Sequence, residues 1–289
     1  MKKKKEQMLK EKKPFIDKRL VVISVALVSI VVLGFLFYQT FMQSPKVEFS
    51  FKAAIIDQIG ENLPSSPESA REFNETVTRI LESAGFNVSY HKSESITVKF
   101  YKELVKYNYG LIILRVHSAL RAGETEIDFF TSERFEENFY RDMQDKGLLT
   151  AGNYTWMPGE FYFAITPKFI ESLDGYFPNS IVIAMGCWSL KSDYEEMAKA
   201  FIKKGAKAYI GWTDAVSMWH SDNSTVRFLQ YLLEKNMTIN NAINKCNAFH
   251  DLVYYNAELS YYPPEIGNYK FSDFTASAVL NILFDKEQK

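Results

Sequence analysis

The amino-acid sequence predicts an α/β domain of three layers, in which helices cover both faces of a mainly parallel, doubly wound sheet, preceded by one transmembrane helix. The first observation is that short apolar runs alternate with segments of helical periodicity. The second is that these runs are continuous, which is typical of parallel strands covered on both faces. The third is that residues 20–38 contain no charged side chain. Together these observations predict one large domain and one membrane anchor.

Residues 20–38 are predicted to be an uncleaved signal-anchor helix. At a rise of 1.5 Å per residue the segment spans about 30 Å, the thickness of the hydrocarbon layer, and no cleavage site typical of a signal peptide follows it. Residues 1–19 carry nine Lys and Arg against three acidic residues, so the positive-inside rule places this tail in the cytoplasm. After a linker at residues 39–49, the domain at residues 50–289 is expected outside the cell. The predicted protein is single-pass in the cell membrane, with lipid as the partner of residues 20–38.

The charge distribution argues against a nucleic-acid partner for the domain. Beyond the basic tail, 25 Lys and Arg stand against 32 Asp and Glu, which is the reverse of a nucleic-acid footprint. A basic tail next to a spanning segment is explained better by membrane topology than by nucleic-acid binding. The two cysteines, Cys187 and Cys246, are too few for a disulfide scaffold and lack the spacing of zinc ligands. We expect no metal and no other cofactor.

The first half of the domain alternates strand and helix. A short apolar strand is predicted at residues 51–56, then a helix that begins near residues 65–67 and a second strand at residues 87–90. A helix over residues 97–106 and a third, buried strand over residues 111–116 follow. This order predicts parallel pairing through right-handed crossovers.

Residues 118–178 interrupt the alternation. They are rich in acidic and aromatic residues, alternate weakly and contain no clear long helix. We interpret them as an insertion, a hairpin or loop excursion near the carboxyl edge of the sheet, where lids and specificity elements tend to lie.

A complete strand, helix and strand unit follows the insertion. Residues 181–185 form a continuous aliphatic run, which we predict to be the central strand. Ser192 and Glu195 have the spacing of a capping box, the helix that they begin ends at Gly205, and residues 208–212 form the next strand. Two helices and a final strand are expected beyond it, at residues 225–233, 239–254 and 276–284.

His117 and Cys187 are the candidate catalytic residues. His117 follows the third strand and Cys187 follows the fourth. In the strand order 2-1-3-4-5 these two strands are neighbours, and their carboxyl ends meet at one edge of the sheet. A neutral imidazole beside a thiol can act as its base. Each residue also has a structural interpretation, as a hydrogen-bonded histidine and as a small buried core cysteine.

Three stretches of the domain resemble one known family. LIILRVHS is similar to an apolar strand followed by His-Gly, IVIAMGCWS to an apolar strand followed by Ala-Cys, and AKAFIKKGAKAYIGWTDAVS to the stretch that follows a catalytic cysteine. These are patterns of the caspase-like (clan CD) cysteine peptidases, which include CHAT domains and clostripain, legumain and gingipain relatives. The resemblance covers residues 50–289. It implies a caspase-like fold, His117 as the catalytic histidine, Cys187 as the nucleophile, and the backbone amides of Ser118 and Cys187 as the oxyanion hole.

Two positions depart from the pattern of this family. Ser118 replaces the usual glycine, and glycine tolerates backbone conformations that serine does not. This difference bears on the oxyanion hole, because the amide at that position helps to build it. Gly186 replaces the usual alanine before the cysteine.

Substrate-binding residues are expected at the same edge of the sheet. Asp214 lies after the fifth strand, where relatives place substrate-pocket residues, and an acid there would select Lys or Arg; the alternative is a turn-forming aspartate. Arg115 points to the same face of its strand as His117, as a substrate ligand or as an ion-pair partner of Asp57. The expected set also includes two tryptophans, Trp188 and Trp212.

Two further residues are expected to be structural. His220 is expected on the surface at the start of a helix. Cys246 lies on an apolar stripe with helical spacing and is expected to be a buried, inert thiol.

The sequence therefore predicts a membrane-anchored, extracytoplasmic cysteine endopeptidase that hydrolyses a peptide or protein substrate through a thioester acyl-enzyme. Pairing with His117 should then hold the pKa of the Cys187 thiol below the free value of about 8.5. The alternative from another class is a catalytically inactive surface domain that binds a peptide, glycan or protein through the same cleft. In a third interpretation Cys187 and Cys246 form a disulfide, and both are structural.

Overall fold

The computed structural model describes four stretches of the chain and three isolated residues, namely residues 48–60, 67–123, 125–154 and 157–276, with Ser29, Ile30 and Gly34. The chain divides into two units, Met1–Lys46 and Val47–Lys289. All of the elements named below belong to the second unit.

A six-stranded sheet in the order β10-β9-β8-β3-β1-β2 forms the centre of the second unit. Its parallel strands are β1 (Lys52–Asp57), β2 (Asn87–Lys92), β3 (Leu111–Arg115), β8 (Ile181–Ala184) and β9 (Ala208–Trp212). At one edge β10 (Leu259–Tyr262) pairs antiparallel with β9. Every residue of β3, β8 and β9 is buried. These central strands therefore carry continuous apolar runs, as the sequence indicated.

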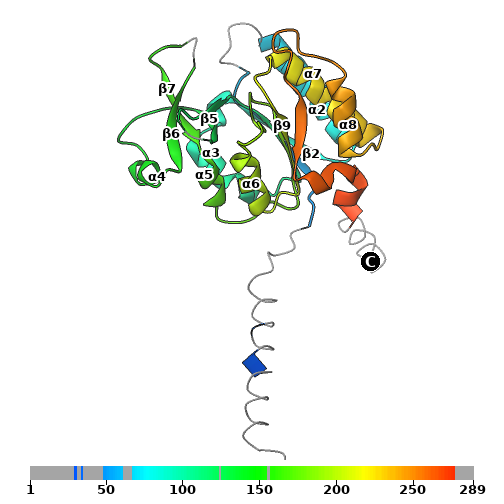
Figure 1. Cartoon of the computed structure of the whole chain (residues 1–289), viewed down its shortest axis with the longest axis horizontal. Coiled ribbons are helices and arrows are strands. Elements are labelled where there is room, and N and C mark those ends of the chain that lie inside the picture. The colour runs from blue at the N-terminus through cyan, green and yellow to red at the C-terminus, as the bar shows by residue number, and fades with distance from the viewer. Residues whose placement is uncertain are drawn as a thin grey trace, which may run out of the picture. The chain divides into compact units, whose positions relative to one another are not determined.

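Helices cover both faces of this sheet (Figure 1). One face carries α2 (Pro67–Ser83), α7 (Met218–Leu229) and α8 (Ile239–Asn247). The other face carries α3 (Val98–Glu103), α5 (Pro167–Glu171) and α6 (Glu196–Lys203). Short helical turns lie at Ser93–Ser95, Leu104–Tyr107, Gln230–Glu234 and Pro264–Asn268.

A second, antiparallel sheet lies between β3 and β8 in the chain. In the order β4-β5-β7-β6, its strands are β4 (Ser118–Leu120), β5 (Ile127–Arg134), β7 (Phe161–Ile165) and β6 (Leu149–Asn153), with the short helix α4 (Arg141–Asp145) before β6. Phe129 and Phe163 of this sheet are fully buried in the same core as α3 and α6. The second sheet is therefore part of the core.

The predicted arrangement of the sheets needs correction. The chain is α/β with mixed sheets, because β10 is antiparallel and the region interpreted as an insertion contains a sheet of its own. The first five residues of β5 are all buried. They include the polar residues Asp128 and Thr131, which interrupt the apolar run without giving the regular alternation of a half-exposed strand. The sequence therefore showed only weak alternation there.

The predicted membrane anchor also needs correction. Within the part of the chain that the structure describes, no helix is long and apolar enough to cross a bilayer. The described residues therefore do not bear out the transmembrane helix predicted at residues 20–38, or the single-pass location in the cell membrane that was inferred from it. Apart from Ser29, Ile30 and Gly34, the predicted tail and helix lie outside the described residues. The expectation was based on hydropathy and length alone, which do not by themselves establish a spanning helix.

Near the C-terminus, one element differs from the sequence-based expectation and another falls almost wholly outside the described residues. The helix expected over residues 239–254 ends at Asn247. The chain then turns, because the carboxylate of Asp251 accepts hydrogen bonds from the backbone N–H groups of Ser217 (2.6 Å) and Val253 (2.8 Å). The strand expected at residues 276–284 lies outside the described residues except for Ala276, which is helical.

The burial of the second sheet generates a prediction for stability. Phe129→Ala should lower the free energy of unfolding by about 3–5 kcal/mol, because it opens a cavity in the shared core. Phe161→Ala, at an exposed position of the same sheet, is the matched control and should cost about 0.5 kcal/mol. Urea unfolding of both variants measures the difference. Equal, small losses would mean that the sheet is peripheral.

Candidate functional site

The candidate site lies at the carboxyl ends of β3 and β8. These strands pair in parallel, with Leu114 opposite Ala184, so the predicted neighbourhood of the two strands is confirmed. His117 follows the end of β3 and Cys187 follows the end of β8. Both residues line one cavity of about 360 Å³. The structure thus brings the two predicted catalytic residues to one place, while their roles remain predictions.

Two further segments complete the wall of this cavity. The first turns of α7 contribute Ser217, Met218 and Ser221, and the loop after α8 contributes Val253 and Tyr254. The helix is held over the strand ends because the Ser221 hydroxyl donates to the Met185 carbonyl oxygen at 2.9 Å. The cavity is therefore bounded by the sheet on one side and by α7 on the other.

The thiol of Cys187 is half-buried and contacts the chain at Val216. The backbone N–H of Val216 donates to Sγ at 3.4 Å, and Sγ lies 3.6 Å from the Val216 carbonyl oxygen. Burial raises the pKa of the Cys187 thiol, the hydrogen bond from Val216 lowers it, and the charges of Asp214 and Asp251 raise it further. The net effect is upward, so the thiol is protonated at neutral pH.

His117 is positioned by residues that follow a strand of each sheet, Gln58 after β1 and Tyr154 after β6. Its backbone N–H donates to Gln58 Oε1 at 3.1 Å, and Gln58 Nε2 donates to the Tyr154 hydroxyl at 2.7 Å. The ring packs against the edge of Tyr154, with 4.7 Å between the ring centroids. Burial, together with the positive charge of Arg115, lowers the pKa of His117 to about 4. The imidazole is therefore neutral at neutral pH.

These directions correct one expectation and confirm another. The sequence predicted that the pKa of the Cys187 thiol lies below its free value, and the structure gives the opposite direction because burial dominates. Cys246 is buried on the apolar face of α8, as predicted, and burial raises the pKa of its thiol to about 12. Both thiols are free, which rules out the disulfide interpretation.

Ser118 and Gly186, the two departures from the family pattern, lie against each other. The Ser118 hydroxyl donates to the Cys187 carbonyl oxygen at 2.5 Å and so ties the two strand ends together. A Cβ atom at position 186 would lie 2.2 Å from Ser118 Oγ and 2.6 Å from the Val116 carbonyl oxygen. The hydroxymethyl group of Ser118 therefore occupies the space that an alanine at position 186 would need.

The backbone of Ser118 is turned away from its partner strand. The N–H of Phe130 donates to the carbonyl oxygen of His117, and the N–H of Arg121 donates to the carbonyl oxygen of Glu126. In an antiparallel pair, hydrogen-bonded positions alternate with positions that do not bond. Ser118 lies opposite Phe129 at one of the non-bonding positions. Its N–H therefore points toward the free edge of β4.

The predicted substrate-binding residues Asp214, Trp188 and Trp212 are not among the residues that line the cavity. Asp214 Oδ1 accepts hydrogen bonds from Trp188 Nε1 (2.9 Å) and from the N–H of Ala215 (2.7 Å). Asp214 therefore links its own turn to the loop that carries Cys187. This is the turn-forming role that the sequence analysis left open as the alternative. Trp212 is buried, and its indole N–H donates to the Ser221 hydroxyl at 3.0 Å.

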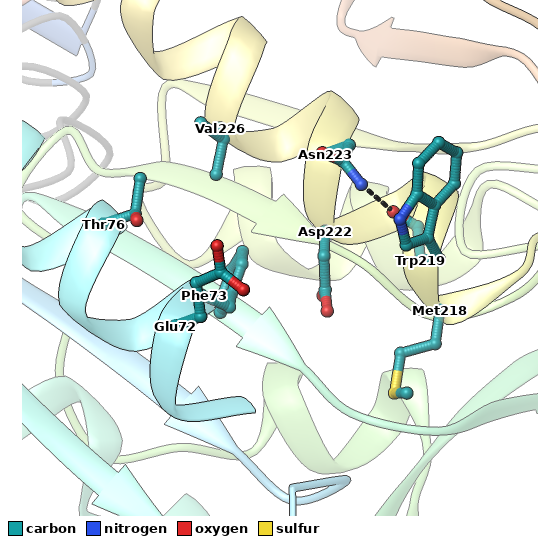
Figure 2. Close-up of a pocket in the computed structure, with 8 residues that line it drawn as sticks. All are labelled: Glu72, Phe73, Thr76, Met218, Trp219, Asp222, Asn223 and Val226. Carbon is teal, nitrogen blue, oxygen red and sulfur yellow. Dashed lines mark hydrogen bonds between the residues drawn. The ribbon is translucent and has the colours of Figure 1, made fainter. Parts of the chain in front are cut away.

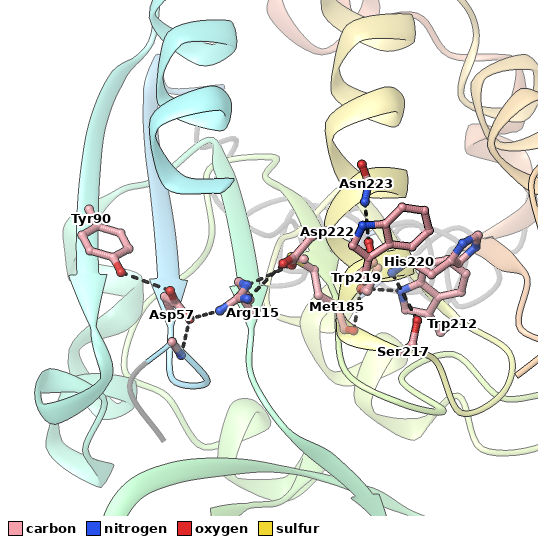
Figure 3. A network of polar contacts seen from close by, with 12 residues as sticks. Asp57, Tyr90, Arg115, Met185, Trp212, Ser217, Trp219, His220, Asp222 and Asn223 are labelled. Carbon is pink, nitrogen blue, oxygen red and sulfur yellow. Dashed lines mark hydrogen bonds and ion pairs between the residues drawn. The ribbon is translucent and has the colours of Figure 1, made fainter. Parts of the chain in front are cut away.

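Arg115 lies in the cavity wall at the centre of a buried ion cluster (Figure 3). Its Nη1 contacts Asp57 Oδ1 at 2.7 Å, which confirms the ion pair that the sequence suggested. Its Nε and Nη2 donate to the two carboxylate oxygens of Asp222 in α7, at 2.9 and 3.0 Å. Asp57 also accepts from the Tyr90 hydroxyl at 3.1 Å. Arg115 is 1% exposed, so its charge is committed to the fold.

A second cavity adjoins this cluster at Asp222. It measures about 270 Å³ and lies between α2 and α7, and Met218 and Asp222 line both cavities. Figure 2 shows Glu72 of α2 and Asp222 of α7 on either side of this space. Among the described residues, no group of three or more His, Cys, Asp or Glu side chains could hold a metal ion.

Sequence reasoning missed several residues that position the site. Gln58 follows β1 at the same sheet edge as His117, and that position was a signal that could have been used. Asp222 and Tyr154 lie far away in the chain, and only the topology brings them close. His220 was expected on the surface, but it is buried against Trp212 with 5.4 Å between the ring centroids.

Comparison with known proteins adds no family to this picture. No protein-family model matches the chain, and no curated protein matches it.

The contact between Ser118 and Gly186 generates a double-variant prediction. Gly186→Ala should lower the free energy of unfolding by about 1–3 kcal/mol, because the added methyl group overlaps Ser118 Oγ. Adding Ser118→Gly should relieve part of this loss, since the Val116 carbonyl oxygen remains close. Urea unfolding of all four combinations should give a coupling of about 1 kcal/mol. Additive losses would contradict the steric explanation.

Proposed function

We propose that this domain is a cysteine endopeptidase, in which Cys187 attacks the peptide carbonyl and His117 acts as its base. The observation that carries the proposal is that both side chains line one cavity at the carboxyl ends of adjacent parallel strands. Ligands of open α/β sheets bind at such edges. The resemblance of both strand ends to the caspase-like peptidases supports the same assignment.

The pKa directions define how the chemistry begins. Because the thiol and the imidazole are both neutral at rest, the thiol proton passes to His117 as sulfur attacks the carbonyl carbon. The imidazolium then gives this proton to the leaving amine, and the C–N bond breaks to leave a thioester. Water, deprotonated by His117, attacks the thioester and releases the acid and the thiol.

Backbone amides are the proposed donors to the oxyanion. The N–H of Ser118 points toward the free edge of β4 because its neighbours take the hydrogen bonds to β5. The bond from the Ser118 hydroxyl to the Cys187 carbonyl oxygen holds this strand end next to the cysteine. The backbone N–H groups of Ser118 and Cys187 would then form a pair of preorganised donors to the oxyanion.

One observation favours the alternative of a catalytically inactive domain that binds a peptide, glycan or protein. Burial raises the pKa of the Cys187 thiol and lowers that of His117. Both shifts make the thiolate and imidazolium forms scarce at neutral pH, and the thiolate is the nucleophilic form. A domain that only binds in this cleft would show the same directions.

Hydrolysis of a fluorogenic peptide library by the purified domain tests the proposal. Cys187→Ala should abolish hydrolysis, and His117→Ala should lower kcat/KM by about 10²–10⁴, the contribution of a positioned base. Cys246→Ala, which removes the buried thiol of α8, is the control and should retain wild-type activity. Hydrolysis that survives Cys187→Ala would contradict the proposal. Peptide binding without any hydrolysis by the wild type would support the inactive domain instead.

A further inference from the structure

The cavity that holds Cys187 has mostly apolar walls. Apart from the catalytic pair, its surface comes from the strand ends, the start of α7 and the loop after α8, and the apolar residues are Ile59, Val116, Met185, Val216, Met218 and Val253. Apolar linings of this kind bind ligands by removing apolar surface from water. The side chain that enters this space gains most if it is itself apolar.

The charged residues in the wall are already paired with each other. Asp222 forms two hydrogen bonds to the guanidinium of Arg115, and Arg115 also contacts Asp57. The remaining Asp57 oxygen accepts from Tyr90, and a backbone N–H donates to Asp57 as well. His117 in the same wall is neutral at neutral pH. A charged substrate side chain would therefore lose its hydration on entering the cavity. Among the described residues of this wall, it would find no charged group that is not already paired.

Asp214, which was expected to select basic side chains, forms hydrogen bonds outside the cavity wall. The carboxylate of Asp214 accepts from the Trp188 indole and from its own turn. Asp214 is not among the residues that line the cavity. A Lys or Arg side chain that occupies the cavity would thus not meet this carboxylate within the cavity wall.

An exposed apolar rim continues outward from the cavity. The loop after α8 exposes four large apolar residues in succession, Leu252, Val253, Tyr254 and Tyr255, with exposed fractions of 90%, 69%, 45% and 69%. Val253 and Tyr254 also line the cavity, so the apolar surface is continuous from solvent to Cys187. The loop is fixed by the hydrogen bonds of Asp251 to Ser217 and Val253. Of these four residues, only Val253 and Tyr254 reach the cavity, and they form its apolar mouth.

We propose that this cavity, with Val253 and Tyr254 at its mouth, binds an uncharged, apolar side chain of the peptide substrate, at the residue next to the bond that Cys187 attacks. Selectivity then comes from Val253 and its apolar neighbours rather than from Asp214. The inference rests on the proposed peptidase function, because the substrate residue in the cavity is identified by its position next to the bond that the Cys187 thiol attacks.

Peptidyl chloromethyl ketones that differ only in the residue next to the reactive carbon test this assignment. The probes carry Leu, Met, Phe, Lys, Arg or Asp at that residue. The rate at which each probe alkylates Cys187 in the full-length chain is measured by intact-protein mass spectrometry. Iodoacetamide, which has no such side chain, serves as the reference for thiol reactivity. The Leu, Met and Phe probes should react about tenfold to a hundredfold faster than the charged ones, the discrimination expected of an apolar pocket.

A pair of neighbouring substitutions locates the selectivity. Val253→Asp places a carboxylate in the cavity wall and should lower the rates of the apolar probes about tenfold relative to iodoacetamide, while the Lys and Arg probes gain. Leu252→Asp makes the same change at a position that is 90% exposed and does not line the cavity, and it should leave the ratios unchanged.

Three outcomes would overturn the inference. They are faster reaction of the Lys, Arg or Asp probes with the wild type, equal rates for all probes, and equal effects of Val253→Asp and Leu252→Asp. If Cys187-dependent hydrolysis persists in any of these cases, the proposed function stands and only the specificity fails. If iodoacetamide alkylates Cys187 but no peptidyl probe does, both the specificity and the peptidase function fail.

Discussion

The buried guanidinium of Arg115 imposes the arrangement on which the candidate site depends. It lies at the end of β3, and a buried cation is tolerated only when it is paired and hydrogen-bonded. Asp57 from the end of β1 supplies one partner and Asp222 from α7 supplies the other. Helix α7 must therefore lie across the strand ends, where its first turn closes the cavity over Cys187 and His117. Loss of either carboxylate would leave an imperfectly compensated charge in the core.

The same enclosure sets the protonation of the candidate catalytic pair, Cys187 and His117. Burial favours the uncharged form of each group, and the charge of Arg115 further disfavours an imidazolium at His117. A nucleophile of this kind is generated only as the proton moves to the base during attack.

Much of the main sheet could be read from the sequence, because buried parallel strands leave continuous apolar runs such as residues 111–116 and 181–185. The order of those runs placed His117 and Cys187 at one edge, and strand alternation suggested the pair of Arg115 with Asp57. The second sheet was missed because the buried polar residues Asp128 and Thr131 leave β5 with neither a continuous apolar run nor a regular alternation.

Other features depended on contacts between distant parts of the chain. Asp222 is 107 residues from Arg115, and no local pattern marks it as the second partner. The expected low pKa of Cys187 was wrong because position at a strand end does not reveal burial. The role expected of Asp214 changed because the indole of Trp188 reaches its carboxylate. The membrane anchor was inferred from hydropathy, and the described part of the chain contains no spanning helix.

The pH dependence of Cys187 alkylation tests the central claim most directly, namely that the thiol and imidazole form a neutral pair in one cavity. In a Cys246→Ala background, the rate with iodoacetamide should rise in a single step centred above the free-thiol value of about 8.5. No second step should appear near neutral pH, because His117 has already lost its proton above its pKa of about 4. A rate that is already maximal at pH 6–7 would reveal a thiolate–imidazolium pair and would contradict the account.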